Sequence, residues 1–222
     1  MGIQLNPDLS FCELDGRLVF LDIERDRYFS LSEELERGFR RYLETHNPHD
    51  PTVARLIAHK ILQQGPSTDS SNPLVPLEAP EWSAVEAGHA RKDCSIRMVT
   101  DVFRVVLMAR HRLRTRTLGE IAMALGRSRT HGETPGSTAP GDEVLLLAAS
   151  FNAIRPYVPI EMRCLIDSLA LMRFLQAHGH DAQLVIGVAC DPFSAHAWVQ
   201  RGRCVLNDTL GNAESHVPIR VI

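Results

Sequence analysis

The sequence lacks the features of a membrane or secreted protein. No apolar run approaches the ~20 residues needed to cross a bilayer. The N-terminal sequence MGIQLNPDLS has neither the basic start nor the apolar stretch of a signal peptide. A net charge of −3 at pH 7 gives no general argument for nucleic-acid binding. We therefore expect a cytoplasmic protein with no membrane span and no nucleic-acid partner.

Cysteine is scarce in this chain. There are five cysteines, an odd number, and no CxxC pair. This pattern disfavours both a disulfide framework and a structural zinc site, so we expect reduced thiols and no metal ion. A free cysteine ordinarily serves as a small buried apolar side chain, and we expect that role for Cys12, Cys94, Cys190 and Cys204.

The residues that are present suffice for a packed core. Apolar residues make up 44% of the chain and charged residues 23%, which is typical of soluble globular proteins. The length suits one large domain or two small ones. A stretch over 67–80 is rich in Ser, Asp, Asn and Pro, as linkers are. We predict a domain over 1–66, a linker over 67–92 and a second domain over 93–222.

The first domain shows strands followed by helices. Residues 11–31 contain three short runs rich in aromatic and branched residues, with Asp15-Gly16 as a hairpin signal between the first two. Ser32 is a candidate N-cap of the first helix. Asp50-Pro51 begins a second helix, which we expect Gly65-Pro66 to end. The pattern predicts a small winged-helix-like α+β domain.

The second domain begins with helices and ends with strands. From Asp93 onward the apolar residues fall at helical spacing, apart from a polar, Gly- and Pro-rich loop over 128–142. The last helical pattern, CLIDSLALMRFLQAHG, begins at Cys164. Helices followed by an antiparallel sheet describe an α+β domain. We expect its strands at about 182–189, 195–200, 203–207 and 216–221.

Three residues of the last third could carry chemistry. Cys164 opens an apolar helix, His196 lies in a strand-like run (AHAWV) and Asp208 ends another (RCVLND). The helix dipole and a neighbouring imidazolium would both lower the pKa of the Cys164 thiol. His196 would return the proton to a leaving amine, and Asp208 would orient the ring. A turn near Gly202 allows a hairpin that brings the last two together.

Each of these residues has a more ordinary explanation when it is taken singly. A cysteine in an apolar helix is usually a core residue, and so is a lone histidine in a strand. A zinc site built from the same trio lacks an evident fourth ligand. The three residues together, in this chain order and on these elements, favour a papain-like or transglutaminase-like cysteine site.

A basic run precedes this site in the chain and has two interpretations. It could contact an acidic peptide or a partner protein, or it could be a solvated helix face, which is the commoner case. No aromatic residues are interleaved for base stacking. The run consists of Arg110, Arg112, Arg114 and Arg116.

The sequence resembles the lasso-peptide B proteins in their fused form, the leader peptidases of ribosomally made lasso antibiotics. The resemblance covers nearly the whole chain. In the second domain it rests on RHRLRTRTLGEIAMAL at 110–125, RCLIDSLAL at 163–171, AHAWVQ at 195–200 and the region of Asp208. In the first domain FCELDGRLVFLDIERDRYFSLS resembles the small leader-binding domain related to the pyrroloquinoline quinone chaperone.

The resemblance implies a bacterial cysteine peptidase of the cytoplasm with a transglutaminase-like catalytic domain. The first domain would bind the leader of a precursor peptide, and the second would cut the leader from the core. Cys164 would be the nucleophile, His196 the base and acid, and Asp208 the orienting carboxylate. No cofactor is implied for this chain. ATP would be used by a partner macrocyclase similar to asparagine synthetase.

An exposed sheet edge in the first domain could bind the leader as an added strand. Apolar residues of its third strand and second helix are the candidates for leader contact, although core packing is the ordinary role of each one. Two other functions stay open: a non-catalytic leader-binding scaffold, and an acyl transferase that uses the same cysteine. The candidate leader-binding residues are Tyr28, Phe29, Leu31, Val53 and Ile57.

Overall fold

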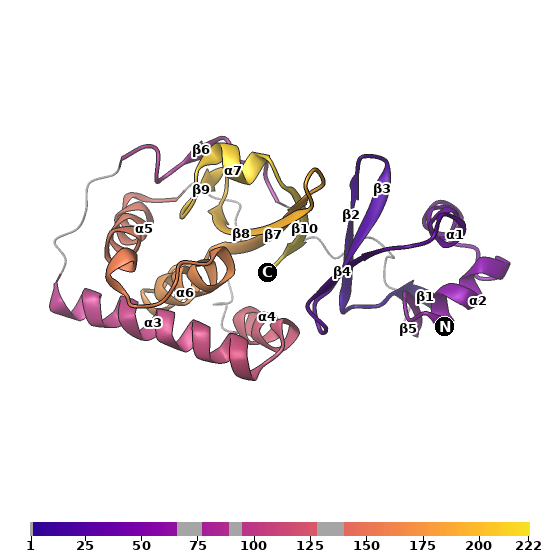
Figure 1. Cartoon of the computed structure of the whole chain (residues 1–222), viewed down its shortest axis with the longest axis horizontal. Helices are drawn as coiled ribbons and strands as arrows, with labels where there is room; N and C mark the ends of the chain where they lie inside the picture. The colour runs from indigo at the N-terminus through magenta and orange to yellow at the C-terminus, as the bar shows by residue number, and fades with distance from the viewer. Residues whose placement is uncertain (1, 66–76, 89–94, 128–139) are drawn as a thin grey trace. The chain divides into compact units, whose positions relative to one another are not determined.

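A computed structural model describes residues 2–65, 77–88, 95–127 and 140–222. The chain divides into two compact units, Met1–Leu74 and Val75–Ile222, and each has its own strands and helices (Figure 1). Within the described ranges, no helix is both long and apolar enough to cross a bilayer.

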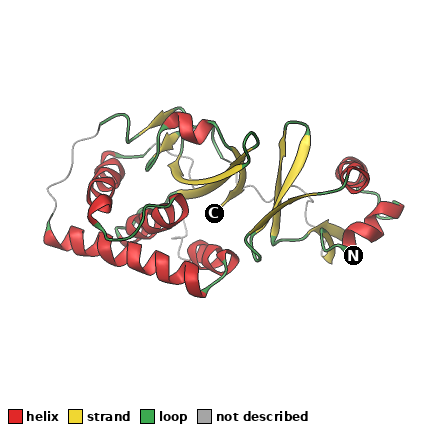
Figure 2. Ribbon diagram, viewed as in Figure 1, coloured by secondary structure: helices red, strands yellow, loops and turns green. Residues whose placement is uncertain are grey.

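The first unit contains the three predicted strands as an antiparallel meander in the order β2-β3-β4 (Figure 2). The two predicted helices follow, and a further pair of strands, β1 and β5, was not predicted. The elements are β1 (Gly2–Leu5), β2 (Leu9–Leu14), β3 (Arg17–Asp22), β4 (Arg27–Ser30), α1 (Glu33–Thr45), α2 (Pro51–Ala58) and β5 (Leu62–Gly65).

Local backbone chemistry explains most of these boundaries. Asp15 and Gly16 both have positive φ, 49° and 76°, as the tight turn of a two-residue hairpin requires. Asp50 caps α2 by accepting a hydrogen bond from the N–H of Thr52 at 2.8 Å. The predicted end of α2 at Gly65-Pro66 is wrong. The helix ends at Ala58 because the following residues turn and pair with β1.

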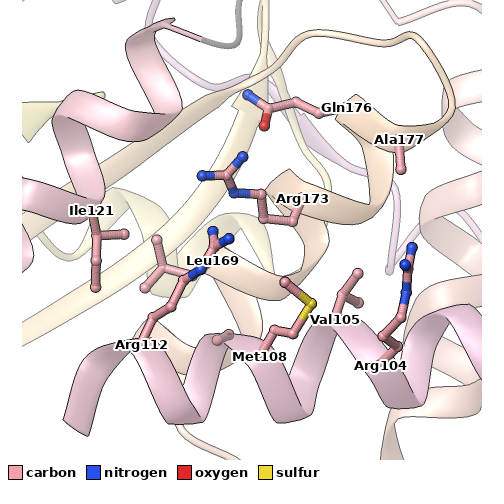
Figure 3. A pocket seen from close by; sticks show the side chains of 10 residues that line it. Arg104, Val105, Met108, Arg112, Ile121, Leu169, Arg173, Gln176 and Ala177 are labelled. Atoms are coloured by element: carbon pink, nitrogen blue, oxygen red, sulfur yellow. The ribbon is translucent and has the colours of Figure 1, made fainter. Parts of the chain in front are cut away.

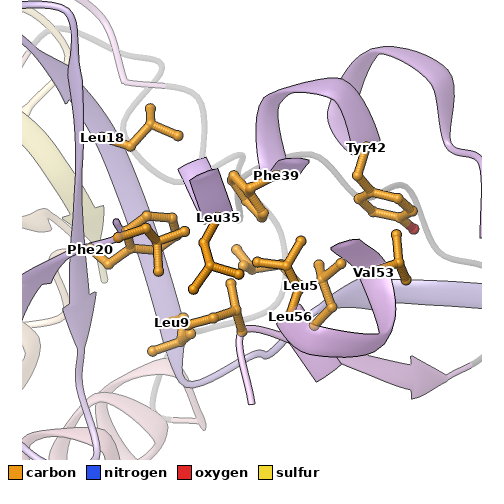
Figure 4. Close-up of a cluster of buried hydrophobic side chains, with 12 residues drawn as sticks. Leu5, Leu9, Leu18, Phe20, Leu35, Phe39, Tyr42, Val53 and Leu56 are labelled. Carbon is orange, nitrogen blue, oxygen red and sulfur yellow. The ribbon is translucent and has the colours of Figure 1, made fainter. Parts of the chain in front are cut away.

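The core of the first unit lies between its sheet and its two helices (Figure 4). The rings of Phe20 and Phe39 are both fully buried and meet edge to face, with centroids 5.3 Å apart. The buried cluster consists of Leu5, Leu9, Leu18, Phe20, Leu31, Leu35, Phe39, Tyr42, Val53, Leu56, Ile61 and Leu62.

The second unit has the predicted α+β organisation, in which helices precede an antiparallel sheet. Helix α6 is apolar on nearly all sides and packs against the sheet and against α3 and α5, as a helix without a polar face must. The helices are α3 (Ile96–Thr115), α4 (Leu118–Arg127), α5 (Asp142–Ile154) with the 3₁₀ turn η1 (Arg155–Tyr157), α6 (Cys164–Ala177) and α7 (Leu210–Glu214).

The sheet of the second unit has the strand order β10-β7-β8-β9-β6. Its antiparallel strands lie close to the predicted positions, and the added strand β6 runs parallel to β9. The strands are β6 (Trp82–Ser83), β7 (Gln183–Ala189), β8 (Ser194–Arg201), β9 (Cys204–Val205) and β10 (Val217–Val221).

Strand β6 changes the predicted domain boundary. Trp82 and Ser83 fall inside the stretch 67–92 that the sequence assigned to a linker, yet they pair with Cys204 and Val205 in the sheet. The pairing spans more than a hundred residues of chain, so no local sequence signal marks it. The predicted loop over 128–142 lies outside the described residues except at its end.

Strand β7 approaches β8 closely at Gly187, which lies opposite His196 in the ladder. A Cβ atom at Gly187 would come within 2.8 Å of the Trp198 ring and 2.9 Å of His216. We expect Gly187→Ala to lower the free energy of unfolding by about 1–3 kcal/mol through overpacking. Gly126→Ala faces open space and should not lower it. Urea denaturation measures the free energy of unfolding of both variants. Equal values for the two would contradict the close approach of β7 and β8 at Gly187.

Candidate active site

Cys164 is the first residue of α6. The preceding residue, Arg163, has extended backbone (φ −139°, ψ 129°), so the helix begins at the thiol-bearing residue itself. Hydrogen bonding to the His196 ring lowers the pKa of the Cys164 thiol. Partial burial opposes this shift, and a hydrogen bond from the Ala197 backbone adds to it. The position and the contacts both favour a thiolate.

His196 and Asp208 lie on and just after neighbouring strands. His196 is on β8, Asp208 follows β9, and His196 Nε2 is hydrogen-bonded to Asp208 Oδ2. Hydrogen bonds to Asp208 and then to Cys164 raise the pKa of His196 to about 9, against the effect of burial. Burial raises the pKa of Asp208, but hydrogen bonds from His196 and Asn212 lower it on balance. The structure therefore brings the three predicted residues together.

A turn between β8 and β9 makes this meeting possible. Gly202 has a φ of +54°, and the flanking residues pair as Gln200 with Val205 and Arg201 with Cys204. The hairpin expected near Gly202 is therefore present.

A partly buried hydrogen-bond network links residues that lie close in the chain to Cys164, His196 and Asp208. Ser168 lies one turn after Cys164 and donates from Oγ to the carbonyl of Ala197 at 2.9 Å. Asn207 Nδ2 donates to Ser168 Oγ at 2.9 Å. Asn207 Oδ1 accepts from the N–H of Val199 at 2.8 Å. This network fixes α6, β8 and the segment after β9 relative to one another.

Arg155 fixes the segment that leads into α6. Its side chain is 2% exposed, and Nε donates to Asp167 Oδ1 at 2.5 Å. Its two Nη atoms donate to the carbonyls of Ile160 and Glu161 at 3.1 Å each. Asp167 also accepts from the N–H of Arg163 at 3.1 Å. Arg155 and Asp167 together thus hold residues 160–163 against the first turn of α6.

Asn212 is a site residue that the sequence analysis missed. Its Nδ2 donates to both carboxylate oxygens of Asp208 at 3.1 Å each. Thr209 caps the short helix α7 by accepting from the N–H of Asn212, which places Asn212 one turn after Asp208. An N-cap threonine with a polar residue three positions later was the available signal.

The candidate leader-binding residues fall into two groups. Tyr28 and Phe29 are half-buried on β4, which has β3 as its one neighbour in the described sheet. Ile57 is half-buried on α2 and packs against the core. Leu31 and Val53 are 7% and 1% exposed and belong to the core cluster, labelled in part in Figure 4. Both therefore pack in the core, and leader contact at Leu31 stays a prediction.

The other cysteines differ from Cys164. Cys12 and Cys204 are buried, as expected, and burial raises the pKa of the Cys204 thiol to about 12. Cys190 is exposed, so the expectation that it is buried was wrong, and Cys94 lies outside the described residues. No group of three or more His, Cys, Asp and Glu side chains arranged to hold a metal ion occurs in the described ranges.

The paired pKa shifts predict a reactive thiol at neutral pH. The thiolate of Cys164 is present above its lowered pKa and is lost as the pH falls through it. The His196 imidazolium is lost as the pH rises through about 9. We expect iodoacetamide to alkylate Cys164 at pH 7 about tenfold faster than in a His196→Ala variant. The alkylation rate of each protein is measured from pH 5 to pH 10. If the rate rises with the same midpoint in both proteins, the pairing of Cys164 with His196 is contradicted.

Comparison with known proteins gives two matches. Residues 105–221, more than half of the chain, match the transglutaminase-like superfamily, and the three site residues lie inside the match. A segment of 45 residues is 51% identical to the Microcin J25-processing protein McjB of Escherichia coli. That segment covers 20% of this chain and 22% of the relative. Both matches agree with the resemblance to the lasso-peptide B proteins. No solved structure matches the chain.

Proposed function

Because the chain belongs to the transglutaminase-like superfamily, we propose that it is a cysteine peptidase of lasso-peptide maturation. It binds the leader of a precursor peptide and cuts the leader from the core before macrocyclisation. The observation that carries the proposal is the convergence of Cys164, His196 and Asp208. The similar Escherichia coli protein is named for processing microcin J25, which supports peptide maturation as the setting.

The geometry supports a two-step hydrolysis. The Cys164 thiolate attacks the carbonyl carbon of the last leader residue, and the His196 imidazolium gives its proton to the nitrogen of the first core residue. The core leaves with a free amine, and the leader stays as a thioester. His196 then takes a proton from water, the hydroxide displaces the sulfur, and the free leader and thiolate form. Asp208 holds the ring in place through both steps.

The first unit offers a place for the leader. A hollow of about 510 Å³ lies along β4 and the end of α2, and Phe29 and Leu31 are among its lining residues. Arg27, Lys60 and His59 also line it. In the described sheet, β4 pairs on one side only, so an extended peptide could add there as a strand. Main-chain hydrogen bonds would supply affinity, and the hollow would accept one or more leader side chains.

Two matched phenylalanines test leader capture. Phe29 and Phe11 are both partly buried and both pack against the same core, but Phe29 lines the hollow, whereas Phe11 is on β2 at the other side of the meander. We expect Phe29→Ala to raise the Kd for a labelled leader peptide about tenfold or more. Phe11→Ala should leave the Kd within about twofold of the parent value.

Fluorescence anisotropy gives both constants, and thermal melting shows whether the two variants are folded at the assay temperature. Similar Kd values for the two variants would show that the leader does not bind at β4.

A leader peptidase of this kind needs a partner to use the amine that it frees. We place an ATP-dependent macrocyclase of the asparagine-synthetase type in that role, because joining a carboxylate to an amine requires activation. Cleavage by this chain draws only on a thiol, an imidazole and water. We therefore assign ATP to the partner macrocyclase.

A further inference from the structure

Asp208 lies on a bend between β9 and α7, outside the strands of the described sheet. Its side chain is bonded to His196 and Asn212, but its backbone has no ladder to hold it, so contacts from other segments have to fix its position. One such contact comes from Ser83 on β6, whose Oγ donates to the carbonyl of Asp208 at 2.5 Å. The two residues are 125 positions apart in the chain.

The surroundings of the Ser83 hydroxyl fix the direction of this bond. The hydroxyl oxygen accepts from the N–H groups of Val85 at 3.1 Å and Glu86 at 3.4 Å, and a carbonyl oxygen can only accept. The hydroxyl proton is therefore directed at the carbonyl of Asp208. Ser83 is 2% exposed, so water does not readily replace the donor once it is removed.

The same segment makes a second contact just after Asp208. Glu86 Oε2 accepts from the N–H of Leu210 at 3.0 Å, at the start of α7. Helix α7 carries Asn212, which donates to both oxygens of the Asp208 carboxylate. Ser83 and Glu86 thus hold the backbone at Asp208 itself and two residues after it.

The segment that carries β6 is also anchored to the β8–β9 hairpin by other groups. Arg203 Nε pairs with Glu78 at 3.1 Å, and its Nη1 pairs with Glu81. Gln200 Nε2 donates to the carbonyl of Glu78 at 2.6 Å. Strand β6 itself pairs with β9. Removing the Ser83 hydroxyl leaves all of these anchors in place, so the contact with the site can be tested by itself.

We infer that Ser83 is a positioning residue of the active site, which holds the backbone at Asp208 so that the carboxylate meets the His196 ring. The sequence placed Ser83 in a linker, whereas its hydroxyl reaches the catalytic carboxylate residue. The inference rests on the proposed function for the reaction that is measured, but the contact between Asp208 and His196 can be measured without any cleavage. If the parent protein does not cut the precursor, the proposed function fails, and the titration of His196 still tests Ser83.

The test compares Ser83→Ala with Ser150→Ala in the full chain. Ser150 is the matched control, because it is 0% exposed and its Oγ donates to a carbonyl, that of Leu146, at 2.7 Å within α5. Neither serine is among the described lining residues of the hollow of about 330 Å³ between α3, α4 and α6 (Figure 3). Neither replacement therefore alters that hollow, which lies against the helix that carries Cys164.

The first readout is the cleavage of the precursor peptide. We expect Ser83→Ala to lower kcat about tenfold or more, because a displaced carboxylate no longer holds the His196 ring in line with the thiol. The KM should stay within about twofold of the parent value, since the candidate leader contacts belong to the first unit. Ser150→Ala should keep both constants within about twofold. Equal falls of kcat in the two variants would overturn the proposal.

The second readout is the NMR titration of the His196 imidazole, with His196→Ala to assign its signal. Hydrogen bonding to Asp208 is the main reason why the pKa of His196 lies at about 9. A displaced Asp208 therefore lowers this pKa, and the imidazolium is lost at a lower pH. The midpoint should fall by about half a pH unit or more in Ser83→Ala and stay at the parent value in Ser150→Ala. An unchanged midpoint in Ser83→Ala would overturn the proposal.

The His196 ring has two other titratable neighbours among the described residues. They are Cys164 on α6 and His216 just before β10, whose ring centroid lies 5.1 Å away. Both are present in the parent, in Ser83→Ala and in the control, so a change of the midpoint reports on Asp208.

The melting temperature shows whether Ser83→Ala is folded at the assay temperature. If it is not, Ser83→Cys is used, because the thiol fills nearly the same space but is a much weaker donor than the hydroxyl. We expect Ser83→Cys to lower kcat at least about threefold and to shift the His196 midpoint in the same direction. Parent values of both quantities would overturn the proposal.

Discussion

Replacing Cys164 by alanine will leave precursor binding intact and reduce precursor cleavage by about three orders of magnitude or more. The thiol supplies the bond-forming atom, and no neighbouring group can replace it in forming a thioester. Binding should survive because the candidate leader contacts belong to the first unit. Chromatography of the cleaved precursor gives the rate, and anisotropy of a labelled leader gives the affinity.

Cys190→Ala is the matched control, because it removes an exposed cysteine that lies outside the three-residue site. It should cleave at the parent rate. If the Cys164→Ala protein cleaves as fast as the parent, the chain is a leader-binding scaffold and the peptidase assignment is wrong.

The acyl transferase alternative shares the first half of the reaction. A thioester at Cys164 can react with an amine as well as with water, and the residues that form it are the same. Mass spectrometry of the products in the presence of an added primary amine distinguishes the two. We expect the free leader acid as the main product, and a leader amide would identify a transferase.

Replacing Arg155 by methionine will lower the free energy of unfolding by about 3–5 kcal/mol. The side chain of Arg155 is 2% exposed, and its loss removes the hydrogen bond to Asp167 Oδ1 and the hydrogen bonds to two backbone carbonyls. Burial already raises the pKa of Asp167 even beside Arg155. Without the arginine, the half-buried carboxylate keeps the N–H of Arg163 as a donor but has to take up a proton or gain water at its exposed edge. Urea denaturation monitored by circular dichroism measures the loss.

Arg163→Met is the control for charge alone. Arg163 pairs with Glu161 at 2.7 Å, but both side chains are more than half exposed, 67% and 74%, and such surface pairs contribute ~0–1 kcal/mol. A loss for Arg155→Met no larger than for Arg163→Met would show that the buried ion pair does not hold the segment before α6.

The elements around the site could be predicted because their signals are local. Cys164 begins a run with no polar face, His196 lies in a branched and aromatic strand, and a glycine turn separates that strand from the one before Asp208. Hydrophobic periodicity and turn residues suffice for such segments. The order Cys, His, Asp then indicated which side chains would meet.

The missed features depend on contacts between distant parts of the chain. β1 pairs with β5 across some sixty residues, and β6 joins β9 across more than a hundred. The first pairing ends α2 at Ala58, and the second takes Trp82 out of the predicted linker. The residue preferences of these segments do not predict such pairings, because each strand is only two to four residues long.

Supporting residues of the site were missed for a related reason. Ser168 and Asn207 are ordinary polar residues in the sequence, and their importance appears only when α6 and β8 are in contact. Leu31 and Val53 show the reverse case. Their apolar character is equally compatible with a ligand contact and with a core position. Val53 is 1% exposed and belongs to the core, whereas Leu31 belongs to the core and also lines the hollow beside β4.

The most direct test of the proposed catalytic site is covalent capture of the nucleophile, Cys164, by a substrate analogue. A synthetic leader peptide whose last carbonyl is replaced by a vinyl sulfone presents an electrophile where the scissile bond would lie. Intact-mass and peptide-mapping spectrometry should show one equivalent of leader attached at Cys164, and much slower labelling in His196→Ala. Labelling at another residue, or equal labelling rates with and without the imidazole, would contradict the proposed catalytic site.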